Sequence, residues 1–105
     1  MKGRVLVVDD ERHQRDILRM ILEGEGCETA VAGTARQALT AARSETFDIV
    51  LTDLKMPDQD GITLLTALLE AQPGLCVILM TAHGTIDSAV DAMRKGAFDY
   101  LTKPL

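Results

Sequence analysis

The sequence predicts an α/β fold in which five parallel strands form one doubly wound sheet. Two observations support this class. Short apolar runs alternate with stretches of helical periodicity, and their spacing of about 20 residues suits strand–helix–strand units. A chain of 105 residues with 47% hydrophobic and 26% charged residues can also form one ordinary core. We therefore expect a single domain that spans residues 1–105.

Five short segments are the expected strands: residues 4–8, 29–32, 48–52, 76–81 and 99–101. The first, third and fourth contain continuous apolar runs, such as Val5-Leu6-Val7-Val8, which are typical of parallel strands covered on both faces. The second and fifth carry more polar residues and suit the edges of a sheet. With right-handed crossovers, these positions predict the flavodoxin-like strand order 2-1-3-4-5.

Four helices are expected between the strands. The first stops near Gly24, and the second is alanine-rich and capped by Thr34. The third ends before Pro73, and the fourth runs from about residue 85 to 95, before Gly96, with an apolar stripe that we expect to lie mostly in the core. The four apolar patterns are Ile17, Leu18, Ile21, Leu22; Ala35, Ala38, Leu39, Ala42; Ile62, Leu65, Leu68, Leu69; and Ile86, Ala89, Val90, Met93.

Composition argues against several functions. The net charge of −5 has the wrong sign for a surface that binds nucleic acid directly. Apolar runs are far shorter than the roughly 20 residues of a membrane span, and the N-terminal residues carry no export signal. Cys27 and Cys76 lack the spacing of a zinc site or a disulfide framework, so we expect buried, reduced thiols in the cytoplasm.

The pattern stops at residue 105, one turn after the fifth expected strand. A sheet of this kind normally receives a fifth covering helix at that point. We therefore expect the final covering helix to be truncated and the sequence to be a piece of a longer protein.

Chemically useful residues follow four of the expected strands. Asp9 and Asp10 follow the first strand, Asp53 the third, Thr81 ends the fourth, and Lys103 follows the fifth. Taken singly, each could be a helix cap, a turn residue or a solvated charge. Their convergence at the carboxyl ends of the strands, where the strand order reverses, instead indicates a functional site.

Three neighbouring carboxylates predict a metal ion. Each close pair repels by about 4 kcal/mol at an effective dielectric constant near 20, so the group needs a cation or raised pKa values. Oxygen ligands without histidine or thiolate favour Mg²⁺, with Mn²⁺ as a substitute. Thr81 and Lys103 add a hydroxyl and an ammonium that suit a phosphoryl group, so one carboxylate is the expected nucleophile.

Five motifs surround these residues: Val7-Val8-Asp9-Asp10-Glu11, Leu51-Thr52-Asp53-Leu54-Lys55-Met56-Pro57, Asp60-Gly61, Met80-Thr81-Ala82 and Leu101-Thr102-Lys103-Pro104. Together they resemble the receiver domains of two-component response regulators. The resemblance covers the whole chain and lacks only the fifth helix. It implies that Asp53 accepts a phosphoryl group from the phosphohistidine of a cognate sensor histidine kinase.

The resemblance also implies a magnesium site and a switch. Asp9, Asp10 and Asp53 would hold Mg²⁺ together with the main-chain carbonyl of Lys55. Thr81 and Lys103 would contact phosphoryl oxygens, with a cis peptide bond expected between Lys103 and Pro104. Thr81 and Tyr100 would then act as the switch that repacks the fourth helix and fifth strand.

The segment from Thr81 to Leu101 looks most like receivers of sigma-54-dependent transcription activators of the nitrogen-regulatory protein C type. This narrower resemblance implies a parent chain with an ATPase domain and a DNA-binding domain that regulate transcription. A homodimer is a further assembly to consider. The domain would not be an enzyme for an external substrate, because it would catalyse only its own phosphorylation and dephosphorylation.

Other readings are weaker. A haloacid-dehalogenase-like phosphatase needs an acid two residues after the nucleophile, where Lys55 stands. A nucleotide-binding module needs a glycine-rich loop at residues 9–13, where this sequence has none. A calcium-binding loop would place Met56 and Ala67 at ligand positions, where neither side chain can bind calcium, so we interpret Gly61 as a turn residue. A stand-alone or phosphorylation-independent receiver that acts as a protein interaction module remains the alternative.

Overall fold

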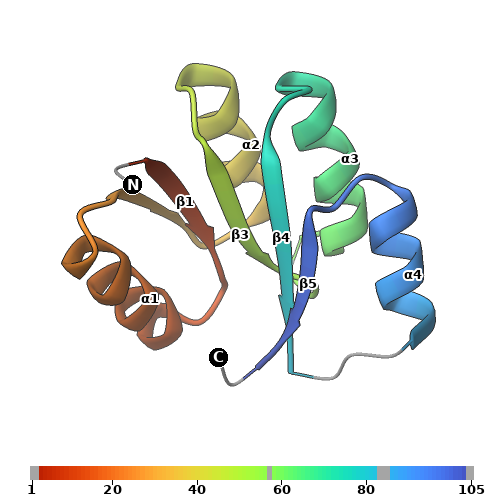
Figure 1. The fold of residues 1–105 in the computed structure, drawn as a ribbon, viewed down its shortest axis with the longest axis horizontal. Coiled ribbons are helices and arrows are strands. Elements are labelled where there is room, and N and C mark those ends of the chain that lie inside the picture. Colours follow the sequence, from red (N-terminus) through yellow and green to blue (C-terminus); the bar gives the residue numbers. More distant parts are fainter. Residues whose placement is uncertain (1–2, 57, 83–85, 104–105) are drawn as a thin grey trace.

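The expected strand order is confirmed in the computed structural model, which describes residues 3–56, 58–82 and 86–103. One parallel sheet has the order β2-β1-β3-β4-β5 (Figure 1). Its strands are β1 (Arg4–Val8), β2 (Glu28–Ala32), β3 (Ile49–Asp53), β4 (Cys76–Thr81) and β5 (Asp99–Thr102). The three strands with continuous apolar runs are the central ones, each paired with a neighbour on both edges.

Helices cover both faces of this sheet. They are α1 (Arg12–Gly24), α2 (Ala35–Ser44), α3 (Gly61–Ala71) and α4 (Ile86–Arg94). Figure 1 shows α1 on one side and the other three on the opposite side. Thr34 caps α2 as expected, because its hydroxyl oxygen accepts the Gln37 N–H at 3.1 Å. No helix within the described residues is both long and apolar enough to cross a membrane.

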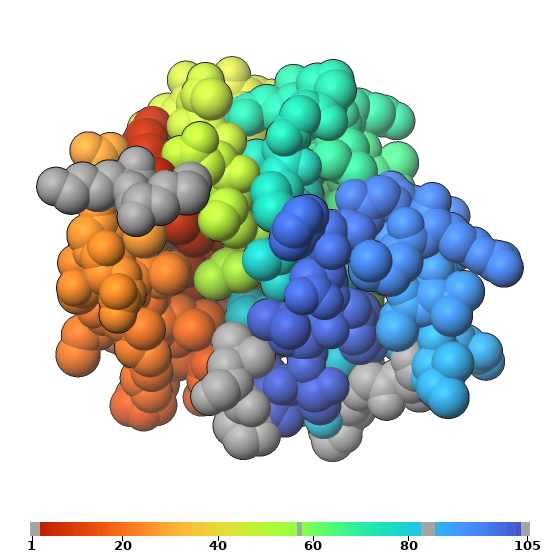
Figure 2. Space-filling view, viewed as in Figure 1, coloured from red at the N-terminus to blue at the C-terminus, as the bar shows by residue number. Residues whose placement is uncertain are grey.

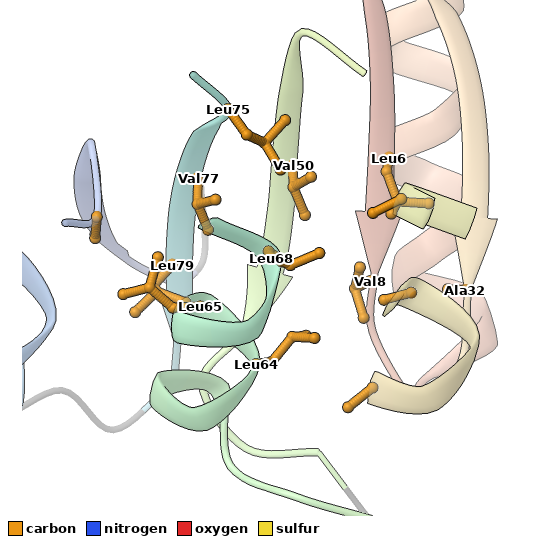
Figure 3. Close-up of a cluster of buried hydrophobic side chains, with 14 of the residues drawn as sticks. Leu6, Val8, Ala32, Val50, Leu64, Leu65, Leu68, Leu75, Val77 and Leu79 are labelled. Carbon is orange, nitrogen blue, oxygen red and sulfur yellow. The ribbon is translucent and has the colours of Figure 1, made fainter. Parts of the chain in front are cut away.

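The core is divided by the alternation of side chains along each strand. In β1, Leu6 and Val8 face α2 and α3, whereas Val5 and Val7 face α1. The larger of the two core clusters lies between the sheet and helices α2 and α3 (Figure 3). Its labelled side chains are Leu6, Val8, Ala32, Val50, Leu64, Leu65, Leu68, Leu75, Val77 and Leu79.

The apolar stripe of α4 corrects one expectation. Ile86, Val90 and Met93 are 83%, 43% and 48% exposed, so the large members of the stripe are not core residues. Ala92, outside the stripe, is fully buried. The reason is position: α4 lies at the margin of the molecule beside the edge strand β5 (Figure 2), where it packs through a small side chain. The stripe is therefore a surface.

The cysteines correct another expectation. Cys27 and Cys76 are free, as expected, but they are only partly buried. Cys76 is the first residue of β4 and is only partly buried there, but this burial is enough to raise the pKa of its thiol. Its thiolate form is therefore scarce at neutral pH.

Candidate functional site

Parallel pairing brings the functional candidates to one edge of the sheet. Val8 pairs with Thr52, Asp53 with Met80, and Thr81 with Thr102, so these strands end together. Backbone hydrogen bonds extend the ladder beyond two strand ends: the Asp9 N–H donates to the Ala32 carbonyl at 3.1 Å and the Lys103 N–H donates to the Thr81 carbonyl at 2.7 Å. The structure thus brings the predicted residues of four strands to a common rim.

Three carboxylates meet at this rim. One oxygen from each of Asp9, Asp10 and Asp53 lies within 4.8 Å of the others. Asp9 is buried, Asp53 is partly buried and Asp10 is exposed. Such a cluster of hard oxygen donors fits Mg²⁺, which is commonly held by one or two carboxylates and keeps several waters on its open side. The fold therefore brings together the three carboxylates of the expected donor set.

Lys103 bridges two of these acids. Its Nζ lies 2.8 Å from Asp9 Oδ2 and 3.0 Å from Asp53 Oδ2. Burial lowers the pKa of Lys103, but the hydrogen bonds and charges of Asp9 and Asp53 raise it, and the net shift is upward. The ammonium therefore stays charged and offsets part of the acidic repulsion.

The loop that carries Asp9 and Asp10 is held from two directions. Asp9 Oδ1 accepts the Glu11 N–H at 3.0 Å, which fixes the turn into α1. The Arg15 guanidinium donates from Nη1 to the Asp9 carbonyl at 2.8 Å. Sequence reasoning missed Arg15, because a single arginine in a helix carries no signal of where its long side chain reaches.

The loop after Asp53 turns sharply around a glycine. The Lys55 N–H donates to Asp53 Oδ1 at 3.2 Å, while the Lys55 side chain is exposed. Gly61 begins α3, so the expected turn is in fact a helix start. A Cβ at Gly61 would lie 2.8 Å from the Asp53 carbonyl oxygen and from Leu54 Cα. Close packing of α3 against the backbone of Asp53 and Leu54 therefore requires glycine.

The expected switch residues lie on neighbouring strands. Thr81 is buried at the end of β4. Tyr100 of β5 is partly buried against the larger core, and its hydroxyl lies 2.8 Å from that of Ser88 on α4. Sequence reasoning missed Ser88. The expected cis peptide between Lys103 and Pro104 lies outside the described residues.

Asp58 makes a third contact that the sequence did not predict. Its two carboxylate oxygens accept the N–H groups of Ala35 at 2.9 Å and Arg36 at 3.0 Å, at the start of α2. These hydrogen bonds lower the pKa of Asp58. Aspartate is a common cap, but here it caps a helix that begins 23 residues before it.

A doubly wound sheet of this order, with an acidic cluster and a lysine where the strand order reverses, defines a receiver-type signalling domain. The family model of the response regulator receiver domain matches residues 5–105, and the chain belongs to this family. Its relatives include the transcriptional regulator NtrC of Proteus hauseri, 46% identical over 98% of this chain, and ZraR of Escherichia coli K12, 43% identical over 96%.

The chain spans only 22% of that NtrC and 23% of that ZraR. Among solved structures, a CheY-like receiver domain protein from Methanospirillum hungatei has a TM-score of 0.95 and 34% identity. That match covers 100% of this chain and 84% of the other. The chain therefore matches a small part of the NtrC and ZraR regulators and most of this solved receiver domain protein.

Proposed function

We propose that this domain accepts a phosphoryl group on Asp53 from the phosphohistidine of a sensor histidine kinase in the cytoplasm. The observation that carries the proposal is the placement of Asp53 beside Asp9, Asp10 and the Lys103 ammonium. This arrangement supplies a carboxylate nucleophile and a positive charge for the transferred group. Relatives that are named transcriptional regulators support a role in transcription control.

In the proposed step, an Asp53 carboxylate oxygen attacks phosphorus. The phosphorus–oxygen bond forms while the phosphorus–nitrogen bond to the kinase histidine breaks, and the leaving imidazole nitrogen takes a proton. Lys103 would pair with one phosphoryl oxygen and the Thr81 hydroxyl would donate to another. In the reverse modification, water attacks the phosphorus of the aspartyl phosphate, the bond to the Asp53 oxygen breaks and inorganic phosphate leaves. The domain would thus catalyse only its own phosphorylation and dephosphorylation.

Mg²⁺ is the proposed cofactor, with Mn²⁺ as a substitute. Asp9, Asp10 and Asp53 would provide the side-chain ligands, and the Lys55 carbonyl would complete the protein ligands. When bound, the ion neutralises charge on the phosphoryl oxygens. The chain's own contribution is to hold the acids together against their repulsion, which Lys103 already does for two of them.

The proposed output is a shift in the contact between α4 and β5. Phosphoryl oxygens would draw Thr81 inward, and Tyr100 would leave Ser88 and occupy the vacated space. The partners of this face would be the ATPase and DNA-binding domains of the parent protein, or a second copy in a homodimer.

Acetyl phosphate and phosphoramidate test the proposal, the latter because it contains the same phosphorus–nitrogen bond as phosphohistidine. Each is added with and without Mg²⁺, and the intact mass is measured for the wild type, Asp53→Asn and the control Asp16→Asn. Asp16 is an exposed aspartate of α1. We expect one phosphoryl group on the wild type and on the control, and none on Asp53→Asn or without Mg²⁺.

Two results would contradict the proposal. An adduct that persists in Asp53→Asn would place the modification on another residue. No adduct on the wild type from either donor would favour a phosphorylation-independent interaction module, which is the competing function.

A further inference from the structure

The contact between Asp58 and α2 joins two parts of the chain that the proposed reaction needs to keep in place. Asp58 lies in the loop between β3 and α3 and accepts the N–H groups of Ala35 and Arg36. Thr34 independently caps the same helix through Gln37. Asp58 therefore satisfies two further N–H groups at the start of α2 and, unlike Thr34, also fastens the loop to the helix.

The loop between β3 and α3, called the acceptor loop below, contacts the Asp53 carboxylate directly. It starts directly after Asp53, and the Lys55 N–H donates to Asp53 Oδ1. The base of the loop is closed by the bridge between Lys55 and Asp60 and by the Gly61 N–H, which donates to the Leu54 carbonyl at 2.5 Å. Asp58 adds an anchor beyond this base, so the loop that contacts the Asp53 carboxylate is tied both to itself and to α2.

The other end of the contact is fixed next to the remaining acids. Gly33 precedes the cap of α2, and a Cβ there would lie 2.9 Å from Arg15 Nη1. That same nitrogen donates to the Asp9 carbonyl. The start of α2 thus packs beside the loop that carries Asp9 and Asp10, and Asp58 connects it to the loop that follows Asp53.

We propose that Asp58 is a positioning residue that sets the separation between Asp53 and the Asp9–Asp10 pair by fastening the acceptor loop to α2. The inference deepens the proposed phosphoacceptor function and rests on it. A carboxylate at a helix N-terminus is electrostatically favourable, and its lowered pKa keeps Asp58 ionised near neutral pH. The contact is therefore present under the conditions of the proposed reaction.

The test is a Mg²⁺ titration of the unphosphorylated domain, followed by the amide resonances of residues near the acidic cluster. Asp58→Ala should raise the half-saturating Mg²⁺ concentration roughly three- to tenfold, toward the range known for groups that orient metal ligands. Asp58→Asn keeps one acceptor oxygen and should fall between Asp58→Ala and the wild type. Hydrogen exchange of the Lys55 amide should accelerate in the same order.

Thr34→Ala is the matched control, because it removes a cap from the same helix but leaves the loop contact. It should leave the Mg²⁺ midpoint unchanged. Equal shifts in Thr34→Ala and Asp58→Ala would overturn the inference, because helix stability would then explain both. An unchanged midpoint in both Asp58 variants would overturn it as well. Failure of the proposed function looks different: the wild type would bind Mg²⁺ but accept no phosphoryl group.

Discussion

The Lys103 ammonium lies 2.8 Å from a carboxylate oxygen of Asp9, a residue 94 positions earlier in the chain. Asp9 is 1% exposed, and a buried carboxylate without a cationic partner is costly. The contact joins the residues that follow β1 and β5. We therefore expect it to stabilise the folded domain whether or not the domain is phosphorylated.

Lys103→Met keeps the apolar stem and removes the charge. We expect the free energy of unfolding at neutral pH to fall by about 1–3 kcal/mol, because Asp9 loses its charged donor. We also expect the rate of phosphorylation by acetyl phosphate to fall by roughly 100-fold or more. Urea denaturation and intact mass measure the two effects, and an equally stable variant would contradict the structural role.

The pH dependence of that stability follows from the raised pKa of Lys103. A group whose pKa is higher in the folded state contributes fully below its unfolded value and loses the contribution as pH rises through the folded value. The difference between wild type and Lys103→Met should thus be constant from about pH 7 to 9 and shrink above about pH 10.5. Urea denaturation across this range measures it, and a difference that grew at alkaline pH would have the wrong sign.

Removal of one acidic side chain from the cluster should raise the thermal stability of the domain without Mg²⁺ and lower it relative to wild type with Mg²⁺. Asp10→Asn relieves repulsion in the acidic cluster, so we expect a higher melting temperature than wild type without Mg²⁺. With Mg²⁺ at 100 times its dissociation constant, the wild type should gain about 2.7 kcal/mol and the variant much less. Thermal melts with and without Mg²⁺ measure both, with Asp16→Asn as the control.

The close approach of α3 predicts that Gly61 tolerates no side chain. Gly61→Ala would press a methyl group against the backbone of Asp53 and Leu54, and we expect a loss of about 1–3 kcal/mol in unfolding free energy. At Gly74 a Cβ would meet nothing within 4 Å, so Gly74→Ala should change stability by no more than about 0.5 kcal/mol. Equal effects at the two glycines would refute the steric argument.

The exposed stripe of α4 predicts that substitutions on its two sides change the free energy of unfolding by different amounts. Ile86→Gln should leave the unfolding free energy within about 0.5 kcal/mol of wild type, because Ile86 is 83% exposed. Ala92→Leu should cost about 1–3 kcal/mol, because the site is fully buried. Chemical denaturation measures both variants. A large loss of unfolding free energy in Ile86→Gln would contradict the exposure of the stripe and indicate that it belongs to the core.

Tyr100 offers a direct readout of the proposed switch. It is the chain's one tyrosine and there is no tryptophan, so the intrinsic fluorescence reports the contact between Tyr100 and Ser88. We expect acetyl phosphate with Mg²⁺ to change this emission in the wild type and not in Asp53→Asn. Emission that stays constant while the mass shows a phosphoryl group would contradict movement of Tyr100.

Much of the fold could be read from local patterns. Runs such as that at Val5–Val8 are apolar on both faces only in central strands, and this placed β1, β3 and β4 correctly. The α4 stripe shows the limit of such patterns. Helical spacing identifies which residues share a face, but it does not say whether another element covers that face.

The sequence by itself determined the strand order and the convergence of Asp9, Asp10, Asp53, Thr81 and Lys103, because parallel strands end at a common edge. Only the tertiary structure decided that Asp58 reaches Ala35, that Ser88 meets Tyr100 and that Gly61 lies against Leu54. These contacts join side chains and loops of different elements. The geometry of these contacts depends on how the helices pack on the sheet, which cannot be read from the spacing of residues along the chain.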